Sequence, residues 1–247
     1  MQKKLLLTFL ISLAACTIPT KTEAMVDYIK GSFKIFSEFL RKPNQIAALS
    51  ESSPALVNTI IEDIINRKTA DQLNILELGF GTGPVTKQII KNMDPKDYLD
   101  AIEFEETFYT LVKTQIEEKY TKTDLANVHL HRADFTQWNS DFTRTYDIII
   151  CTIPFTRLPK KSLEEILEKI DKLLKPDGSF TYISILGARF FGKLKLKTED
   201  RKAYSEKMDC LDAWTVKTFS QKNQRFVLMN MPPAWVYHLT KNKILKN

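Results

Sequence analysis

Residues 73–90, LNILELGFGTGPVTKQII, place an acid and closely spaced glycines at the end of an apolar run. Glu77 is followed at alternate positions by Gly79, Gly81 and Gly83. Glycines let the backbone bend sharply and approach a ligand without a Cβ in the way. A carboxylate at the end of a strand attracts a cationic group and repels a pyrophosphate. The stretch therefore predicts a site for a small ligand that carries positive charge.

The glycine spacing disagrees with two common nucleotide-binding motifs. A G-x-G-x-x-G fingerprint would need a third glycine at Pro84 if it started at Gly79, or at Thr86 if it started at Gly81. A P-loop would need Gly-Lys-Ser/Thr after the turn, and none follows. The turn therefore predicts neither a dinucleotide site nor a P-loop.

Further acids stand at the ends of the next two predicted strands. Glu103 ends YLDAIEF, and Asp134 with Phe135 ends the strand that closes in RADF. A carboxylate at the end of the second strand can accept hydrogen bonds from both hydroxyls of a ribose. Because parallel strands bring their carboxyl ends to one edge of a sheet, we expect these acids to lie close to the glycine turn.

Strand and helix patterns alternate between these residues, which predicts an α/β fold with a mostly parallel, doubly wound sheet. Strands are expected at 74–79, 98–104, 126–134, 146–155 and 179–186, and helices at 84–92, 105–120 and 160–178. Residues 214–231 read as two strands around a polar turn, which predicts an antiparallel hairpin that closes the sheet. The expected sheet has seven strands.

The pattern E-x-G-x-G-x-G, with its companion acids, resembles motif I of the class I S-adenosylmethionine-dependent methyltransferases. The resemblance implies a Rossmann-like fold and S-adenosyl-L-methionine as the cofactor, and it implies that Asp134 accepts the adenine amino group beside Phe135. The residues expected to bind the cofactor are Glu77, Gly79, Gly81, Gly83, Glu103, Asp134 and Phe135. The family places a substrate-facing motif after the fourth strand, so Thr152, Pro154 and Phe155 are the expected substrate residues.

From Met25 onward the chain resembles the soluble bacterial phospholipid N-methyltransferases, which methylate phosphatidylethanolamine towards phosphatidylcholine. The resemblance rests on the entry segment at 32–56, on CTIPFTRLP at 151–159 and on the N-x-P-P-A-x-V-Y pattern at 230–237. It implies a membrane phospholipid amine as the acceptor and an anionic membrane surface as the partner. Tyr28, Tyr237 and His238 are the candidate proton acceptors, but none is assigned, so no catalytic residue is named.

Methylation of adenine in ribosomal RNA is the alternative. Dimethylases of that group carry Asn-Leu-Pro-Tyr after the fourth strand, and their asparagine holds the flat amine. Here Thr152 offers a hydroxyl in place of the amide, and no extra basic domain for RNA is evident. The lipid acceptor is therefore favoured, and nucleic acid is the less favoured partner.

The first 24 residues raise a question of location. They resemble a bacterial lipoprotein signal with Cys16 as the lipidated residue, or an extension upstream of a true start at Met25. Since S-adenosylmethionine is a cytosolic cofactor, the intact set of acids favours Met25 or an uncleaved signal. We expect a cytoplasmic, peripherally membrane-associated enzyme; an exported lipoprotein or interaction protein with a relic site is the remaining alternative.

Composition and periodicity divide the chain into an extension at 1–24, amphipathic N-terminal helices at 25–66 and the methyltransferase domain at 67–247. The net charge of +6 and a pI of about 9.0 favour anionic partners. Three cysteines without a CxxC pair predict neither a metal site nor a disulfide framework. Nothing in the sequence determines an oligomeric state. The first expected helix puts one apolar face beside a basic one: Val26, Ile29, Phe33, Phe36 and Leu40, with Lys30, Lys34, Arg41 and Lys42.

Overall fold

The computed structural model describes residues 52–67, 69–138, 144–194, 196–230 and 232–243. The signal-like residues 1–24 and the amphipathic helix expected at 26–40 lie outside the described residues. The divisions at residues 24 and 66 therefore stay predictions.

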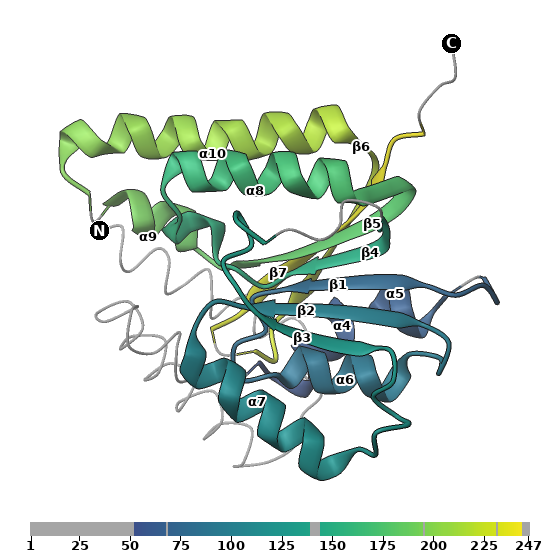
Figure 1. Cartoon of the computed structure of the whole chain (residues 1–247). Coiled ribbons are helices and arrows are strands. Elements are labelled where there is room, and N and C mark those ends of the chain that lie inside the picture. Colours follow the sequence, from purple (N-terminus) through teal and green to yellow (C-terminus); the bar gives the residue numbers. More distant parts are fainter. Residues whose placement is uncertain (1–51, 68, 139–143, 195, 231, 244–247) are drawn as a thin grey trace, which may run out of the picture.

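A seven-stranded sheet with the order β3-β2-β1-β4-β5-β7-β6 forms the centre of the structure (Figure 1). The first five strands pair in parallel, and β7 runs antiparallel to both β5 and β6. The predicted Rossmann-like fold and its closing antiparallel hairpin are confirmed. The strands are β1 (Asn74–Leu78), β2 (Tyr98–Glu103), β3 (Val128–Arg132), β4 (Tyr146–Cys151), β5 (Leu174–Ile185), β6 (Phe219–Val227) and β7 (Ala234–Lys241).

Helices cover both faces of the sheet (Figure 1). One face carries α4 (Pro54–Ile60), α5 (Glu62–Ile65), α6 (Pro84–Asn92) and α7 (Glu106–Lys119), and the other carries α8 (Lys160–Leu173) and α10 (Thr198–Thr218). Successive strand residues point to opposite faces, so Ile75 packs with α6 and α7 whereas Leu76 packs with α8. Two apolar cores, one on each face, hold the sheet between its helices.

The start of α4 shows why this helix begins where it does. Ser53 is the N-cap, its Oγ accepts a hydrogen bond from Leu56 N at 3.2 Å, and Pro54 follows as the first helical residue. Ser53 N donates to Asn230 Oδ1 at 2.9 Å, so the asparagine of the N-x-P-P-A pattern ties α4 to the entrance of β7. The spacing of apolar residues in this segment predicts one buried face, made of Leu56, Ile60, Ile61, Ile64 and Ile65. The first four are buried, but the prediction is wrong for Ile65, the last residue of α5, which is 47% exposed.

Two other boundaries differ from the prediction. The helix expected to run to Pro176 ends at Leu173, because β5 already begins at Leu174 and pairs there with β4. The residues 214–218 that read as a strand form the end of α10, and the polar residues 220–224 that read as a turn lie inside β6. Since β6 is an edge strand with solvent on its outer side, polar residues are tolerated along it.

Two helices between β5 and β6 were not predicted. The short α9 (Ala188–Leu194) and the 21-residue α10 follow the exit of β5. Arg189 of α9 forms a bidentate ion pair with Asp212 of α10, with both Nη–Oδ distances at 2.8 Å. This pair holds α9 against α10. Together the two helices cover the end of the sheet beyond β4 and β5.

A buried carboxylate connects the start of β1 to the start of β2. Asp97, which is fully buried, accepts hydrogen bonds from Arg67 Nη1 at 2.5 Å and Nη2 at 3.1 Å, from Leu73 N at 2.9 Å and from Asp94 N at 2.8 Å. Four hydrogen bonds satisfy the lone pairs of a charge that burial would otherwise penalise.

Replacing this carboxylate should destabilise the fold strongly. Asp97→Ala leaves the Arg67 guanidinium and two backbone N–H groups without their acceptor, so we expect a loss of about 3–5 kcal/mol in the free energy of unfolding. Urea unfolding measures this loss. Glu165→Ala, which breaks the exposed pair with Lys161 at 3.8 Å, serves as the control and should cost less than about 1 kcal/mol. Equal losses in the two variants would contradict the interpretation.

Candidate active site

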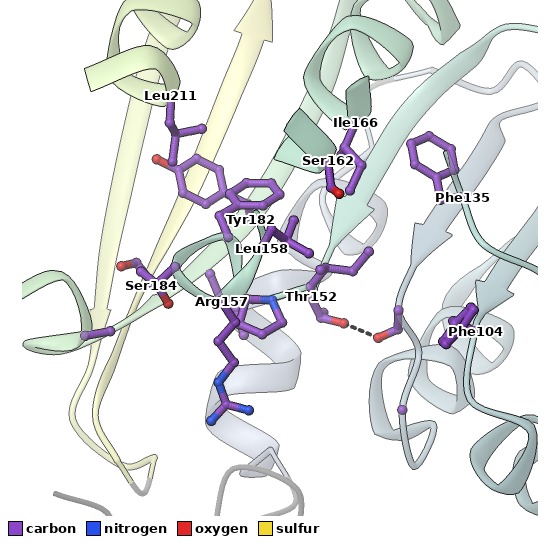
Figure 2. Close-up of a pocket in the computed structure, with 18 of the residues that line it drawn as sticks. Phe104, Phe135, Thr152, Arg157, Leu158, Ser162, Ile166, Tyr182, Ser184 and Leu211 are labelled. Carbon is purple, nitrogen blue, oxygen red and sulfur yellow. Dashed lines mark hydrogen bonds between the residues drawn. The ribbon is translucent and has the colours of Figure 1, made fainter. Parts of the chain in front are cut away.

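A cavity of about 750 Å³ lies where the carboxyl ends of the parallel strands meet. Figure 2 shows Thr152 between two parts of it, with Phe104 and Phe135 on one side and Tyr182, Ser184 and Leu211 on the other. Most of the expected site residues line this cavity: Gly79, Gly81, Glu103, Asp134, Phe135, Thr152, Pro154 and Phe155. Glu77 and Gly83 lie outside its wall.

Glu103 links the turns that follow β1 and β2. Its Oε2 accepts a hydrogen bond from Gly81 N at 2.8 Å, and its Oε1 accepts one from Glu105 N at 2.8 Å. The residue is only 9% exposed. Because each carboxylate oxygen has two lone pairs, both oxygens can still accept a hydroxyl. The two hydrogen bonds therefore fix the orientation of this acid at the cavity and leave one lone pair on each oxygen for a ligand; its expected contact with a ribose stays a prediction.

The three glycines of the turn serve different purposes. All have positive φ angles of +77°, +52° and +80° at Gly79, Gly81 and Gly83, which favour glycine. A Cβ on Gly79 would lie 2.6 Å from Ile153 Cγ1, and one on Gly83 would lie 2.8 Å from Val112 Cγ2. A Cβ on Gly81 would meet no atom within 4 Å. Gly79 and Gly83 therefore permit close packing, whereas Gly81 leaves open space in the cavity.

The exit of β3 forms a tight turn. Asp134 is exposed, and its Oδ1 accepts hydrogen bonds from Thr136 N at 2.9 Å and Thr136 Oγ1 at 2.8 Å. Lys169 of α8 donates from Nζ to the carbonyl oxygens of Phe135, at 2.6 Å, and of Trp138. Burial lowers the pKa of this lysine. Since Phe135 is only 4% exposed, its ring forms a floor of the cavity beside Asp134.

The exit of β4 separates the two parts of the cavity. Thr152 donates its hydroxyl to Gly79 O and thus holds the glycine turn against this loop. Phe155, in the 3₁₀ helix η1 (Phe155–Arg157), is 4% exposed and packs against Tyr182 with ring centroids 5.6 Å apart. Pro154 between them is exposed. The hydroxyl and the aromatic ring of this segment are therefore already engaged within the protein.

Glu77 lies beneath the turn rather than in the cavity wall. Its side chain is fully buried, and neither carboxyl oxygen has a hydrogen-bond partner among the described residues. Burial, together with the nearby charge of Glu103, raises the pKa of Glu77 to about 8. Thr86 on the first turn of α6 is also buried, with an unpartnered Oγ1. The expected attraction of Glu77 for a cationic ligand stays a prediction.

Several residues of the cavity were missed in the sequence. Phe104, directly after Glu103, lines the cavity and is 70% exposed. An apolar side chain at the carboxyl end of a strand is the signal that could have marked it. Lys207 of α10 donates from Nζ to Thr156 O and Leu158 O, both at 2.9 Å, and so fixes the loop after β4. Arg157 and Arg189 line the part of the cavity beyond Thr152. Arg157 lies in the CTIPFTRLP segment, whose pattern could have marked it. No local pattern connects Arg189 or Lys207 with this region, because α9 and α10 reach it only through the tertiary fold.

The two proton-acceptor candidates within the described residues lie in different places. His238 is on the α5 side of the sheet, where its Nδ1 lies 3.0 Å from Thr181 Oγ1 and 3.2 Å from Asp63 Oδ2. Tyr237 faces the other side and stacks on Tyr182, with ring centroids 4.7 Å apart. His238 therefore does not reach the cavity, and Tyr237 reaches it only through Tyr182.

Filling the space above Gly81 should block the cofactor without harming the fold. Gly81→Asn introduces a residue that tolerates the left-handed region and whose side chain enters open space. We expect affinity for S-adenosylhomocysteine in a calorimetric titration to fall at least about tenfold, equivalent to ~1.4 kcal/mol. Gly83→Asn is the matched control, since its Cβ meets Val112 and should lower thermal stability instead. Unchanged affinity in Gly81→Asn would refute this placement of the ligand.

The buried acid should make stability depend on pH. Because the pKa of Glu77 is raised from 4.5 to about 8, its neutral form favours the fold, and this contribution is lost as the pH rises through that window. Glu77→Gln removes the titration. Relative to the variant, the cofactor-free wild type should therefore lose about 3–5 kcal/mol of unfolding free energy between about pH 4.5 and about pH 9. Urea unfolding at both pH values measures the gap, and a constant gap would show that Glu77 does not titrate in this way.

Comparison with known proteins agrees with this geometry. Residues 75–178 match a family described as "Methyltransferase domain". A malonyl-[acyl-carrier protein] O-methyltransferase of Bacillus anthracis is 28% identical over 191 residues, which cover 75% of this chain and 65% of that protein. An ornithine lipid N-methyltransferase of Singulisphaera acidiphila is 26% identical over 157 residues, which cover 63% of this chain and 79% of that protein.

Solved structures show the same fold. The N-methyltransferase NodS of Bradyrhizobium japonicum, in complex with S-adenosyl-L-homocysteine, superimposes with a TM-score of 0.55 at 11% identity and covers 85% of this chain and 98% of its own. The protein PH0226 of Pyrococcus horikoshii reaches a TM-score of 0.55 at 12% identity, over 75% of this chain and 89% of its own.

The donor set of the cavity fits the cofactor that this family uses. Gly81 leaves open space beside the turn, and Glu103 is held with free lone pairs at the end of β2. Fold, family match and site geometry agree, and the chain therefore carries a class I S-adenosylmethionine-dependent methyltransferase domain.

Proposed function

We propose that the protein transfers a methyl group from S-adenosylmethionine to the amine of a membrane lipid, as in the conversion of phosphatidylethanolamine towards phosphatidylcholine. One observation carries the proposal: the cavity continues past Thr152 into a part lined largely by apolar side chains. The charged residues that line this part are arginines, Arg157 and Arg189. Arg189 is engaged with Asp212, so the apolar wall is the feature that suits a lipid.

The two parts of the cavity have separate tasks under this proposal. Glu103 would bind the ribose hydroxyls, Asp134 the adenine amino group, and Phe135 would contact the adenine ring. When bound, the cofactor supplies an electrophilic methyl group on its sulfonium. Holding the acceptor amine in line with that methyl is the main contribution left to the protein, and such alignment can be worth about 7–11 kcal/mol.

The acceptor amine must lose a proton before or during transfer. His238 does not reach the cavity, and the carboxylates that line it, Glu103 and Asp134, belong to the cofactor side. Tyr182, the titratable phenol in the wall, is buried, and burial raises its pKa. We therefore assign the proton to solvent rather than to a side chain.

Support for a lipid acceptor also comes from similarity and from the chain itself. The Singulisphaera relative is named for methylation of an ornithine lipid amine. Among the described residues no helix combines the length and apolarity that crossing a bilayer requires. Under the proposal, contact with the lipid is made through the basic amphipathic segment expected at 26–40 and the anionic surface that it favours.

A malonyl thioester is the second candidate acceptor. The Bacillus relative is named for methylation of a malonyl group on acyl-carrier protein, and an arginine in the wall suits a carboxylate as well as a phosphate. Methylation of adenine is supported less. The Thr152 hydroxyl donates to Gly79 O, so it can only accept from an amine, and Phe155 is buried against Tyr182. The aromatic ring is therefore not free to stack on a flat base.

One labelling experiment separates these acceptors. The full chain is incubated with methyl-labelled S-adenosylmethionine and, in parallel, with phosphatidylethanolamine–phosphatidylglycerol vesicles, malonyl-acyl-carrier protein or unmethylated ribosomal RNA. We expect label in the lipid fraction, none with vesicles of phosphatidylglycerol alone, and none with Gly81→Asn. Label that appears in the carrier protein or in RNA, with none in lipid, would overturn the proposal.

A further inference from the structure

The part of the cavity beyond Thr152, which we call the far compartment, is built by five elements. Its wall comes from η1, α8, β5, α9 and α10, with Ile166, Tyr182, Ala188, Met208 and Leu211 as its main apolar members. Ile166, Tyr182, Met208 and Leu211 are each at most 6% exposed. These side chains therefore belong to the packed core and present only a small part of their surface to the cavity.

A space of this kind favours an apolar occupant. Its wall is mostly hydrocarbon and aromatic surface, and apolar cavities do not retain water well. Each methylene group moved from water into such a space contributes about the same favourable free energy of binding. A flexible chain of methylenes can follow an irregular path along the apolar side chains between β5 and the helices, while Ser162, Ser184 and Arg157 in the same lining offer polar partners to a headgroup (Figure 2).

The short helix α9 connects this compartment to the outside. Ala188 lines the cavity, whereas Phe190 and Leu194 on the same helix are 63% and 57% exposed. Lys193 next to them adds a positive charge. An exposed apolar pair beside a cation is suited to contact with an anionic bilayer. We therefore expect the apolar chain that fits the compartment to belong to a membrane lipid.

We propose that the far compartment binds an acyl chain of the acceptor lipid, which enters beneath α9 and places the headgroup amine beside Thr152. The inference rests on the proposed function and extends it, because it makes the chain, and not only the headgroup, a determinant of recognition. The ion pair of Arg189 with Asp212 holds the wall of the compartment in place.

Binding to single-chain lipids tests this without catalysis. The full chain, with S-adenosylhomocysteine present, is titrated calorimetrically with octanoyl, decanoyl and dodecanoyl lysophosphatidylethanolamine below their micellar concentrations. Affinity should rise about fourfold for each added methylene that is buried, and phosphoethanolamine alone should bind at least about a hundredfold more weakly than the dodecanoyl lipid. Affinity that does not depend on chain length would overturn the proposal.

Matched variants locate the chain. Ala188→Phe fills the compartment and should weaken the dodecanoyl lipid at least about tenfold, while Ala203→Phe, on the exposed side of α10, should not. Retained affinity for S-adenosylhomocysteine shows that each variant is folded. Met208→Ala is the second test, since the larger space should extend the chain length over which affinity still rises. Equal lipid affinity in Ala188→Phe and Ala203→Phe would refute the location.

The two proposals fail in different ways. If lipid binding follows chain length and Ala188→Phe abolishes it, but label enters only a non-lipid acceptor, the proposed reaction is wrong and the apolar compartment stands. If lipid amines are methylated while Ala188→Phe changes neither binding nor rate, the reaction stands and the compartment assignment is wrong.

Discussion

The carboxylate of Glu103 joins the two turns on which the cofactor side of the cavity depends. Its hydrogen bonds from Gly81 N and Glu105 N fix the exit of β1 relative to the exit of β2. Charge-assisted hydrogen bonds of this kind are stronger than neutral ones. Since they are made without a ligand, the acid is already oriented, and under the proposed ribose contact little ordering cost would remain to be met on binding.

The glycine turn is packed closely on both sides, and the hydrogen bond from Gly81 N to Glu103 holds it in this position. Gly79 lies against Ile153 and Gly83 against Val112, so the turn is packed between the β4 exit and α7. Thr152 adds a hydrogen bond to Gly79 O from the same exit. The open space at Gly81 is what remains after these contacts are made. A binding site here is thus a consequence of tight packing on both sides of one residue.

The acceptor side of the cavity is built differently. The residues expected to bind the cofactor sit on strand ends, whose positions the sheet determines, whereas the far compartment is walled largely by the helices α8, α9 and α10. Lys169 and Lys207 place ammonium groups from α8 and α10 on the carbonyls of the β3 and β4 exit loops. These contacts join the helices of the acceptor side to the loops that follow the strand ends.

Local pattern was enough to predict the sheet, the helices at 84–92 and 105–120, and the meeting of Gly81, Glu103 and Asp134 at one edge, because these follow from periodicity and from the geometry of parallel strands. Only the tertiary structure decided that 220–224 are strand, that Thr152 and Phe155 are committed to the protein's own packing, and that Glu77 is buried beneath the turn. Those outcomes depend on partners far away in the sequence: β7 for β6, Gly79 for Thr152, Tyr182 for Phe155. The free energy of these contacts comes from residues that are neighbours in space, and a local sequence pattern does not identify such neighbours.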